Sequence, residues 1–253
     1  MKTVQRLKRE LHSLHGLPLC LQQLVTDGHA LDDATELNAP SDVQLVLLTA
    51  SSASQKRIAN QLVDASCKGK VETLRFLFQA RADMNSFNRS GDTALTGAAQ
   101  FGQLEVLRFL VLEANAEMDL EDRVPRHADG ANTAFLCACE NGHAEVVHFL
   151  LEAGASTVCT GCTGESALMR ASRSGHIEVV RHLVEARADL NLRLGSVQSL
   201  HSGSTALVFA AANGHIQTVQ CLLEARANVD LVNSRGETAL MCASQKLWQL
   251  SSC

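Results

Sequence analysis

Apolar residues recur at helical spacing through most of the chain, in short segments of two alternating types. One type has Val and Leu at spacings of three and four residues, as in Val146, Val147, Leu150 and Leu151, which predicts an amphipathic helix with one buried face. The other type is rich in Ala, which lets neighbouring helices approach closely. A Gly separates the two types and can end the first helix in a left-handed conformation. The pattern therefore predicts pairs of short helices that cannot bury their apolar faces alone.

The glycines between the helices mark an internal repeat. They follow one another at spacings of 33, 40, 33 and 39 residues, at Gly69, Gly102, Gly142, Gly175 and Gly214, and His follows each of the last three. A period near 33 residues is the signature of a solenoid of stacked helix pairs. Thr or Ser stands nine residues before each glycine from Gly102 onward, where its hydroxyl can cap the first helix.

In this register the chain resembles the ankyrin repeat, whose motif runs Gly-x-Thr-Pro-Leu-His, then Ala-Ala, Gly-His, a leucine-rich helix and Gly-Ala-Asp-Val-Asn. The match covers about residues 57–253 as five repeats and a truncated sixth. In the sixth, a first helix starts at Thr238, but Trp248 and Leu250 replace the Gly-His turn. The resemblance implies a mainly α fold, an α-solenoid whose finger loops and concave first-helix surface bind protein partners without catalysis.

The chain departs from the family motif at three kinds of position. Ala replaces Pro after every N-cap, which costs little because Ala is the best helix former. Other residues replace the motif's first His, so we expect its turn hydrogen bond to be missing and the fingers to be looser. Most second helices end at Arg81, Asn115, Arg187 or Arg226 where the motif has Gly. A left-handed conformation at these residues would cost about 1 kcal/mol each relative to Gly.

Insertions explain the uneven spacing. Two finger loops, 120–132 and 192–204, are six residues longer than the others, and one further residue lies near Leu112. Insertions in repeat proteins map to loops on one face, which is often the binding face. Surface loops also tolerate added length at little thermodynamic cost. The sequence leaves both interpretations open.

The first 49 residues have a different pattern, and residues 50–56 are predicted to link them to the repeats. Thr3 can cap a helix that ends at Gly16, a short strand covers 22–25, Asp27 and Gly28 suit a turn, and 42–47 alternates as a half-buried strand does. The order of these elements resembles the ubiquitin-like β-grasp, an α+β fold, without its first hairpin. The missing hairpin would leave the last strand with an unpaired edge.

Only some functional features of the ubiquitin-like β-grasp family have counterparts in this chain. No Gly-Gly pair follows Leu48, so conjugation to targets is not expected. Val25 and Val46 are the two counterparts of the family's hydrophobic recognition patch, and we count them as candidate protein-binding residues. If this segment is functional, ubiquitin-pathway components are the partners that the resemblance implies.

Composition and charge narrow the class of protein. The net charge of −5 and the lack of a basic run argue against nucleic-acid binding. No apolar run is long enough to span a membrane, and the N-terminus lacks the continuous apolar core of a secretory signal. Nine cysteines, an odd number scattered among helix positions, indicate free thiols in a reducing compartment, cytoplasmic or nuclear.

No arrangement of residues points to catalysis, a cofactor or a metal. Cys159 and Cys162 form a single C-x-x-C pair without a second pair at a fitting spacing, so ordinary packing is the favoured role. His143, His176 and His215 occupy the turn that the repeat motif prescribes, where a structural hydrogen bond is expected. We therefore predict a protein that is not an enzyme.

The favoured function is a non-catalytic protein–protein interaction scaffold. Two alternatives remain: a ubiquitin-pathway adaptor that docks a ligase or proteasome subunit through the β-grasp segment, and the targeting fragment of a larger ankyrin-containing enzyme. Besides Val25 and Val46, the candidate protein-binding residues are those that the repeat register places on fingers or on the first-helix surface: Arg89, Ser90, Asp92, Gln100, Phe101, Arg123, Arg126, Glu140, Asn141, Glu165, Arg173, Arg193, His201 and Glu237.

Overall fold

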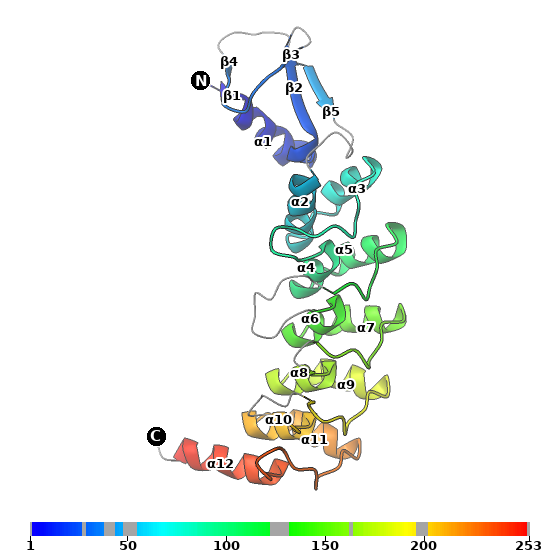
Figure 1. The fold of residues 1–253 in the computed structure, drawn as a ribbon, viewed down its shortest axis with the longest axis vertical. Coiled ribbons are helices and arrows are strands. Elements are labelled where there is room, and N and C mark those ends of the chain that lie inside the picture. Colours follow the sequence, from blue (N-terminus) through cyan, green and yellow to red (C-terminus); the bar gives the residue numbers. More distant parts are fainter. Residues whose placement is uncertain are drawn as a thin grey trace. The chain divides into compact units, whose positions relative to one another are not determined.

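The computed structural model describes residues 2–26, 29–37, 44–47, 55–121, 132–161, 164–195 and 202–251. The chain divides into two compact units (Figure 1). Unit 1 comprises Met1–Ala98 and Glu105–Glu117, and unit 2 comprises Ala99–Leu104 and Met118–Cys253. Each unit is described separately below.

Unit 1 begins with a small α+β segment. Its elements are β1 (Lys2–Thr3), α1 (Val4–His15), a 3-10 turn η1 (Leu19–Leu21), β2 (Gln22–Thr26), β3 (His29–Ala30), β4 (Glu36–Leu37) and β5 (Gln44–Leu47). The described strands form an antiparallel sheet in the order β3-β2-β5 and a separate β1-β4 pair. In the larger sheet Gln23 pairs with Val46 and Leu24 with Leu45. Among the described strands β5 has one neighbour, β2, so its other edge is unpaired there.

The predicted N-terminal helix is confirmed, with both of its ends. The Thr3 hydroxyl accepts a hydrogen bond from the backbone N–H of Arg6, and Gly16 ends the helix at a left-handed φ of 68°. Val4, Leu21 and Leu24 are buried in this segment. The strand predicted at 22–25 is also present and extends to Thr26. The turn expected at residues 27–28 and the start of the strand expected at 42–47 lie outside the described residues.

The N-terminal segment packs directly on the first helix pair, α2 (Gln55–Cys67) and α3 (Val71–Gln79). The Thr73 hydroxyl donates to the carbonyl of Gly16 at 3.1 Å, and the backbone N–H of Cys20 donates to Gln61 Oε1 at 2.8 Å. Helix α2 begins two residues before the predicted start of the repeats at 57. These contacts make the segment part of the same compact unit as the first repeat.

The extra residue near Leu112 produces a local change in helix type. The second pair consists of α4 (Ala94–Gln100) and α5 (Leu104–Arg108), and α5 continues as a π-helix, η2 (Phe109–Glu113). A π-helix closes its hydrogen bonds over one more residue than an α-helix, so it absorbs a single insertion without breaking the element. Phe109 stays buried and makes an edge contact with the ring of Phe78, whereas Leu112 is exposed to solvent.

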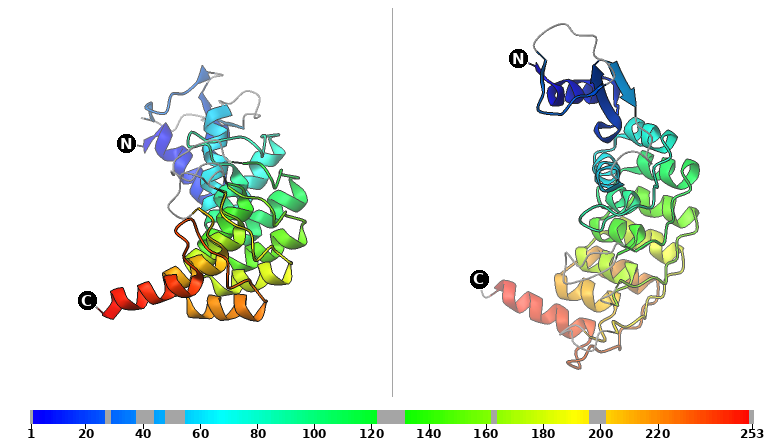
Figure 2. Two further views of the ribbon diagram at one scale, coloured as in Figure 1. Left: turned by 60° about the horizontal axis from the view of Figure 1, so that its bottom comes forward. Right: turned by 45° about the horizontal axis from the view of Figure 1, so that its top comes forward.

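Unit 2 is a regular stack of helix pairs. Its helices are α6 (Ala134–Asn141), α7 (Ala144–Glu152), α8 (Ala167–Ser174), α9 (Ile177–Glu185), α10 (Ala206–Asn213), α11 (Ile216–Glu224) and α12 (Ala239–Ser251). The first helices α6, α8, α10 and α12 pack in one row and the second helices α7, α9 and α11 in another (Figure 1). Helix α12 has 13 residues, against 8 in α10, and extends past α10 in both views of Figure 2.

The predicted caps of the first helices are confirmed. The hydroxyls of Thr133, Ser166 and Thr205 accept hydrogen bonds from backbone N–H groups three residues later. The Ala residues of these helices are buried at the contact between repeats: Ala138, Ala171 and Ala210. The small side chains therefore allow the close helix packing that the sequence pattern predicted.

The Gly-His turn links each repeat to the one before it. Nε2 of His176 donates to the carbonyl of Glu140 at 3.0 Å, and Nε2 of His215 donates to the carbonyl of Arg173 at 2.9 Å. The ring of the later His also lies against the earlier Gly, because a Cβ added to Gly175 would lie 2.5 Å from Nδ1 of His215. These glycines thus supply both a left-handed turn and room for the next histidine.

The residues that replace glycine at the ends of the second helices do adopt the left-handed conformation. Arg81, Asn115, Arg187 and Arg226 have φ values of 61°, 52°, 59° and 67°. These are the positive-φ residues other than Gly in the described part of the chain. Each is strained relative to Gly, because an L side chain crowds the carbonyl oxygen in this conformation.

Candidate protein-binding face

Four fingers in the described part of the chain close in one common way. A backbone N–H at the start of each tip donates to a carbonyl at its end, with N–O distances of 3.0 Å for Asn88 and Asp92, 3.3 Å for Gly161 and Glu165, 2.9 Å for Leu194 and Ser204, and 3.0 Å for Asn233 and Glu237. We name each finger by these closing residues. The residue before the end is a left-handed glycine: Gly91, Gly164, Gly203 or Gly236.

Finger 194–204 carries its six additional residues inside the closed tip, between Leu194 and Gly203. The base of this finger is tied to the next one, because Arg193 Nη2 donates to the carbonyl of Val232 at 2.9 Å. The backbone N–H of Ser234 also donates to the carbonyl of Ser202 at 2.8 Å. Arg193, a predicted binding residue, therefore orders the finger. His201 in this loop, and Arg123 and Arg126 in loop 120–132, lie outside the described residues.

The expectation of looser fingers stays a prediction, and two of the described fingers contain an Asn side chain that bridges the tip. Asn233 Oδ1 accepts the backbone N–H groups of Arg235 and Glu237 at 2.9 and 3.0 Å, and its Nδ2 donates to the Glu237 carboxylate at 2.9 Å. Asn88 makes the same bonds to Ser90 and Asp92. An Asn side chain that bridges its own turn replaces the lost histidine bond.

The carboxylate of Glu237 is held by several donors. Hydrogen bonds from Asn233 and Gln245 lower the pKa of Glu237, because they stabilise its charged form. Gln245 Nε2 lies 3.0 Å from Glu237 Oε1. Glu237 thus joins finger 233–237 to α12.

Two arginines and two glutamates form a network on the first helices. Arg170 is 1% exposed, and its Nη1 donates to Glu140 Oε2 at 2.8 Å. Arg173 bridges Glu165 Oε1 at 3.1 Å and Glu140 Oε1 at 3.5 Å. Glu165 is buried, so of the predicted binding residues Glu140 and Glu165 serve to hold the two arginines. A Cβ at Gly161 would overlap Arg170 Nη2, which explains a glycine there.

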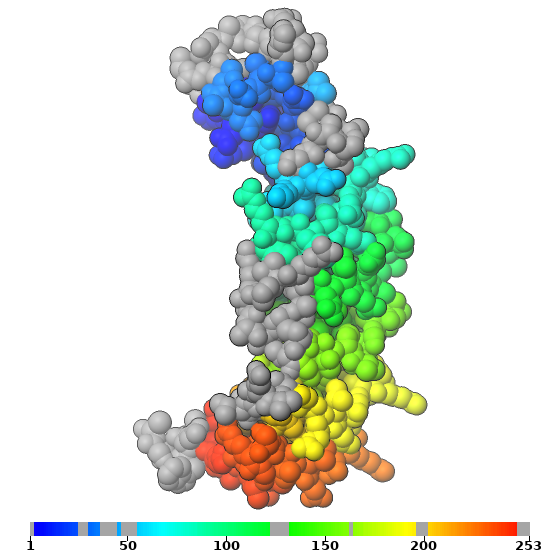
Figure 3. All heavy atoms as spheres, in the orientation of Figure 1, coloured from blue at the N-terminus to red at the C-terminus, as the bar shows by residue number. Residues whose placement is uncertain are grey.

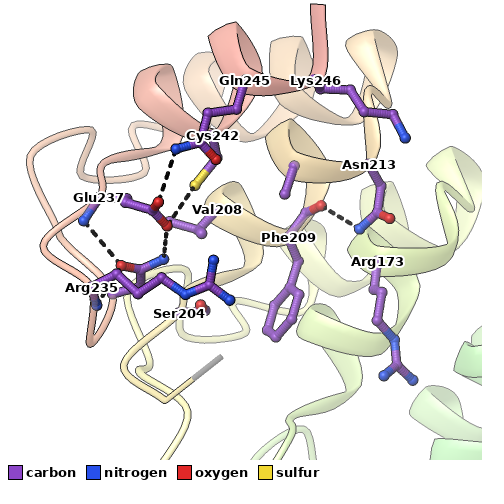
Figure 4. Close-up of a pocket in the computed structure, with 12 residues that line it drawn as sticks. Arg173, Ser204, Val208, Phe209, Asn213, Arg235, Glu237, Cys242, Gln245 and Lys246 are labelled. Carbon is purple, nitrogen blue, oxygen red and sulfur yellow. Dashed lines mark hydrogen bonds between the residues drawn. The ribbon is translucent and has the colours of Figure 1, made fainter. Parts of the chain in front are cut away.

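A pocket of about 290 Å³ lies where fingers and first helices meet (Figure 4). Its walls come from α8, α10, α12, finger 233–237 and the end of finger 194–204. The lining residues are Arg173, Ser204, Val208, Phe209, Ala212, Asn213, Asn233, Arg235, Glu237, Cys242, Gln245 and Lys246. We call these residues the finger pocket.

The finger pocket is locally positive in a chain of net charge −5. It contains three cationic side chains, Arg173, Arg235 and Lys246, and one carboxylate, Glu237. Within the described part of the chain, no carboxylate oxygen lies within 4.0 Å of the charged nitrogens of Arg235 or Lys246. These cations are therefore available to an acidic group from outside.

The sequence located part of this pocket. Arg173 and Glu237 were predicted, whereas Arg235, Lys246, Asn213 and Gln245 were not. The signal for Arg235 was present, because it occupies the same place in its finger as Ser90, a predicted residue. Lys246 and Gln245 carried a comparable signal, because they stand eight and seven residues after Thr238, as the predicted Asn141 and Glu140 stand after Thr133.

The remaining predicted residues are not among those that line the finger pocket. Phe101 is 54% exposed, and Gln100 and Asn141 are also exposed. Arg89 is exposed in unit 1, where its backbone N–H donates to Asn60 Oδ1 at 2.9 Å. In the N-terminal sheet, Val46 is 41% exposed, and Val25 lies in β2.

The described cysteines are free of disulfide bonds, and burial is the main influence on the thiols considered next. Burial raises the pKa of Cys139 well above its usual value, and burial is also the main cause of the raised pKa of Cys159 and Cys242. Cys162, the partner of Cys159 in the C-x-x-C pair, lies outside the described residues. In the described ranges no group of three or more His, Cys, Asp and Glu side chains is placed to hold a metal ion. No helix among the described residues is long and apolar enough to cross a membrane.

Comparison with known proteins identifies the family. Two sequence models of ankyrin repeats match the chain, one at residues 62–111 and the other at residues 123–194 and 193–250. The chain belongs to the ankyrin repeat family, as the register of its glycines, caps and histidines predicted.

A solved structure shares the fold. The similar chain belongs to a structure described as the Bd0816 predatory endopeptidase from Bdellovibrio bacteriovorus in complex with the immunity protein Bd3460. The TM-score is 0.60 at 24% sequence identity, and the match covers 74% of this chain and 92% of that one. At this identity the likeness concerns the fold.

Proposed function

We propose that this protein is a non-catalytic interaction scaffold that binds a partner protein on the fingers and first helices of unit 2. The finger pocket carries the proposal, because it combines a depression with two cationic side chains, Arg235 and Lys246, that have no carboxylate oxygen within 4.0 Å among the described residues. Ankyrin repeats are protein-binding modules, and the similar solved structure is a complex of two proteins, which supports the same class of function.

The size of the finger pocket suggests that it binds a side chain of a partner protein rather than a free small molecule. Its volume of about 290 Å³ is at the lower limit of the range typical for small-molecule sites. Its walls present arginine, lysine and amide groups along with Val208 and Phe209. Such a site accommodates an acidic side chain of a partner, and the positive field accelerates the encounter and selects acidic surfaces.

The fingers around the pocket are ordered before binding. Finger 233–237 is closed by its own Asn, and Arg193 links it to finger 194–204. A preformed surface loses little conformational entropy on association, so more of the contact energy contributes to affinity. The residue set that we expect to contact the partner is Arg173, Arg235 and Lys246.

The test is a charge reversal at Arg235, because its side chain is exposed in the pocket. Tagged full-length protein and its R235E variant are purified from the native cells, and bound proteins are quantified by mass spectrometry. The control is R181E, which reverses an exposed arginine on α9, away from the pocket. We expect the main bound protein to be lost with R235E and retained with R181E. Retention of every bound protein by R235E contradicts the proposal.

A second function is favoured by the N-terminal sheet. Val46 of β5 is 41% exposed, and this apolar side chain is a counterpart of the β-grasp recognition patch. We propose it as a docking site for a ubiquitin-pathway component. The full-length V46D variant should lose binding to purified proteasome or ligase subunits that the wild type binds, and R235E should keep it.

A further inference from the structure

One wall of the finger pocket is formed by a serine whose hydroxyl group is buried. Ser204 lines the pocket at the end of finger 194–204 and is 1% exposed. Its Oγ makes no hydrogen bond in the described part of the chain. A buried polar group without a partner costs free energy, and a ligand that supplies the missing partner recovers it. The hydroxyl of Ser204 is therefore a candidate contact for a ligand oxygen.

The free positive charge of the finger pocket comes from two of its three cations. Arg173 already bridges Glu140 and Glu165 with its guanidinium group. Arg235 belongs to finger 233–237 and Lys246 to α12, and Figure 4 shows both among the residues that surround the pocket. Positive charge therefore reaches a bound ligand from two different elements of unit 2.

The carboxylate in the lining of the pocket is held by neutral groups. Glu237 Oε2 accepts a hydrogen bond from Asn233 Nδ2 at 2.9 Å, and Oε1 accepts one from Gln245 Nε2 at 3.0 Å. Its charge still opposes an incoming anion. The attraction of an anion is thus the balance of two free cations against one carboxylate, and it increases with the charge of the anion.

A phosphate group matches these donors better than a carboxylate does. A carboxylate carries one charge and two oxygens, whereas a phosphate monoester carries a charge of about −1.5 to −2 at pH 7 and three acceptor oxygens. Three oxygens can accept from arginine, lysine and hydroxyl donors on different walls, and arginine binds phosphate in a bidentate geometry. Given the protein-binding role proposed above, on which this inference rests, we propose that the finger pocket binds a phosphorylated serine or threonine of the partner protein.

The shape of the pocket selects a short phosphorylated side chain. Phe209, the aromatic residue of the lining, is 4% exposed, so it presents little of its ring to a phosphotyrosine. The volume of about 290 Å³ is sufficient for the phosphate and the side chain of phosphoserine or phosphothreonine. Finger 233–237, orange-red in Figure 3, lies at the surface of unit 2. A loop of a partner protein can therefore bring its phosphate to the pocket.

The test measures the binding of labelled peptides to the purified full-length protein by fluorescence anisotropy. The probes are degenerate short peptides with phosphoserine at the central position, and two matched sets carry serine or glutamate there. The protein variants are R235E and S204A. The matched control is R181E, because Arg181 is an exposed arginine on α9 that does not line the finger pocket.

We expect the wild type and R181E to bind the phosphoserine set about tenfold more tightly than the glutamate set, because phosphate has more charge and one more oxygen. R235E should weaken this binding about tenfold or more, and S204A about threefold, since a charged donor contributes more than a neutral one. S204A should keep the stability of the free protein, because its hydroxyl has no partner to lose in the described residues. Equal binding of the phosphoserine and glutamate sets, or equal losses with R235E and R181E, overturns the proposal.

A second measurement separates this inference from the proposed function. The purification of bound proteins from the native cells is repeated after the cell extract has been treated with a protein phosphatase. Loss of the R235E-sensitive partner after this treatment supports the phosphorylated ligand. If that partner still binds after the treatment, the finger pocket remains a protein-binding site, but its ligand is not phosphorylated and the inference is wrong.

Discussion

The fourth and sixth repeats start from nearly the same sequence and end in different environments. Each first helix has a hydroxyl N-cap, at Ser166 or Thr238, then Ala and Leu. In α8 the leucine, Leu168, is buried between neighbours, whereas in α12 its counterpart Leu240 is exposed. The comparison shows that local sequence determines the helix, while the neighbouring repeat determines which of its faces form the core.

The largest expected effect lies in the fourth repeat, where the buried Arg170 has no counterpart in α12. The substitution Glu140→Ala removes its closest carboxylate and leaves the buried guanidinium with Glu165 at 3.9 Å, which should lower the free energy of unfolding by about 3 kcal/mol or more. Urea unfolding followed by circular dichroism measures the loss. The control Glu178→Ala removes an exposed carboxylate and should change stability by less than about 1 kcal/mol. Equal effects of the two variants would refute a structural role for the network.

A direct comparison of the two repeats uses their equivalent leucines. Leu168→Ala should cost about 3 kcal/mol, because it removes buried methyl groups and leaves a cavity. Leu240→Ala should change stability by less than about 0.5 kcal/mol, since the side chain is already in water. The same unfolding experiment gives both values. A cost of Leu240→Ala close to that of Leu168→Ala would mean that the Leu240 side chain is covered in solution.

Gly175 and Gly214, which end α8 and α10, allow the cost of backbone strain to be measured apart from the cost of a close contact. Both have left-handed φ values, 77° and 79°, but a Cβ at Gly175 would meet the His215 ring, whereas at Gly214 the nearest atom is Lys246 Cγ at 3.9 Å. Gly175→Ala should therefore cost about 2–3 kcal/mol, and Gly214→Ala about 1 kcal/mol. Thermal unfolding of both variants checks the order, and equal costs would show that the histidine contact contributes nothing.

At the strained ends of the second helices, substitution by glycine should raise the free energy of unfolding rather than lower it. Arg187→Gly and Arg226→Gly should each stabilise the protein by up to about 1 kcal/mol, because glycine adopts a positive φ without crowding. The measurement is again the unfolding free energy. Destabilisation by both substitutions would indicate that these arginines make contacts that outweigh their strain.

The smallest effect concerns the finger that belongs to the sixth repeat. Hydrogen bonds lower the pKa of Glu237, so its contribution to stability is present above the usual carboxyl pKa and is lost as the pH falls through the lowered value. Asn233→Ala removes the largest cause and should raise the pKa of Glu237 toward that of an ordinary glutamate. NMR titration of its side-chain carboxyl carbon measures the shift. An unchanged pKa would show that Asn233 does not hold this finger.

Much of the fold could be predicted from the sequence because it follows local rules. Hydroxyl caps, the glycine at each helix turn and the left-handed arginines depend on residues within a few positions of one another. The site was less predictable. Glu165 was expected on the binding surface, but its burial depends on Arg170 and Arg173, and the role of Arg235 depends on the contact between its finger and α12.

The sequence by itself determined the repeat period, the helix boundaries, the family and the place of the insertions, because each of these leaves a pattern along the chain. Only the tertiary structure decided how the single residue near Leu112 is absorbed, which cations remain without an ion-pair partner in the finger pocket, and that Leu240 faces solvent. The physical reason is that burial and charge pairing are properties of neighbours in space, and identical repeat positions acquire different roles when the next helix differs.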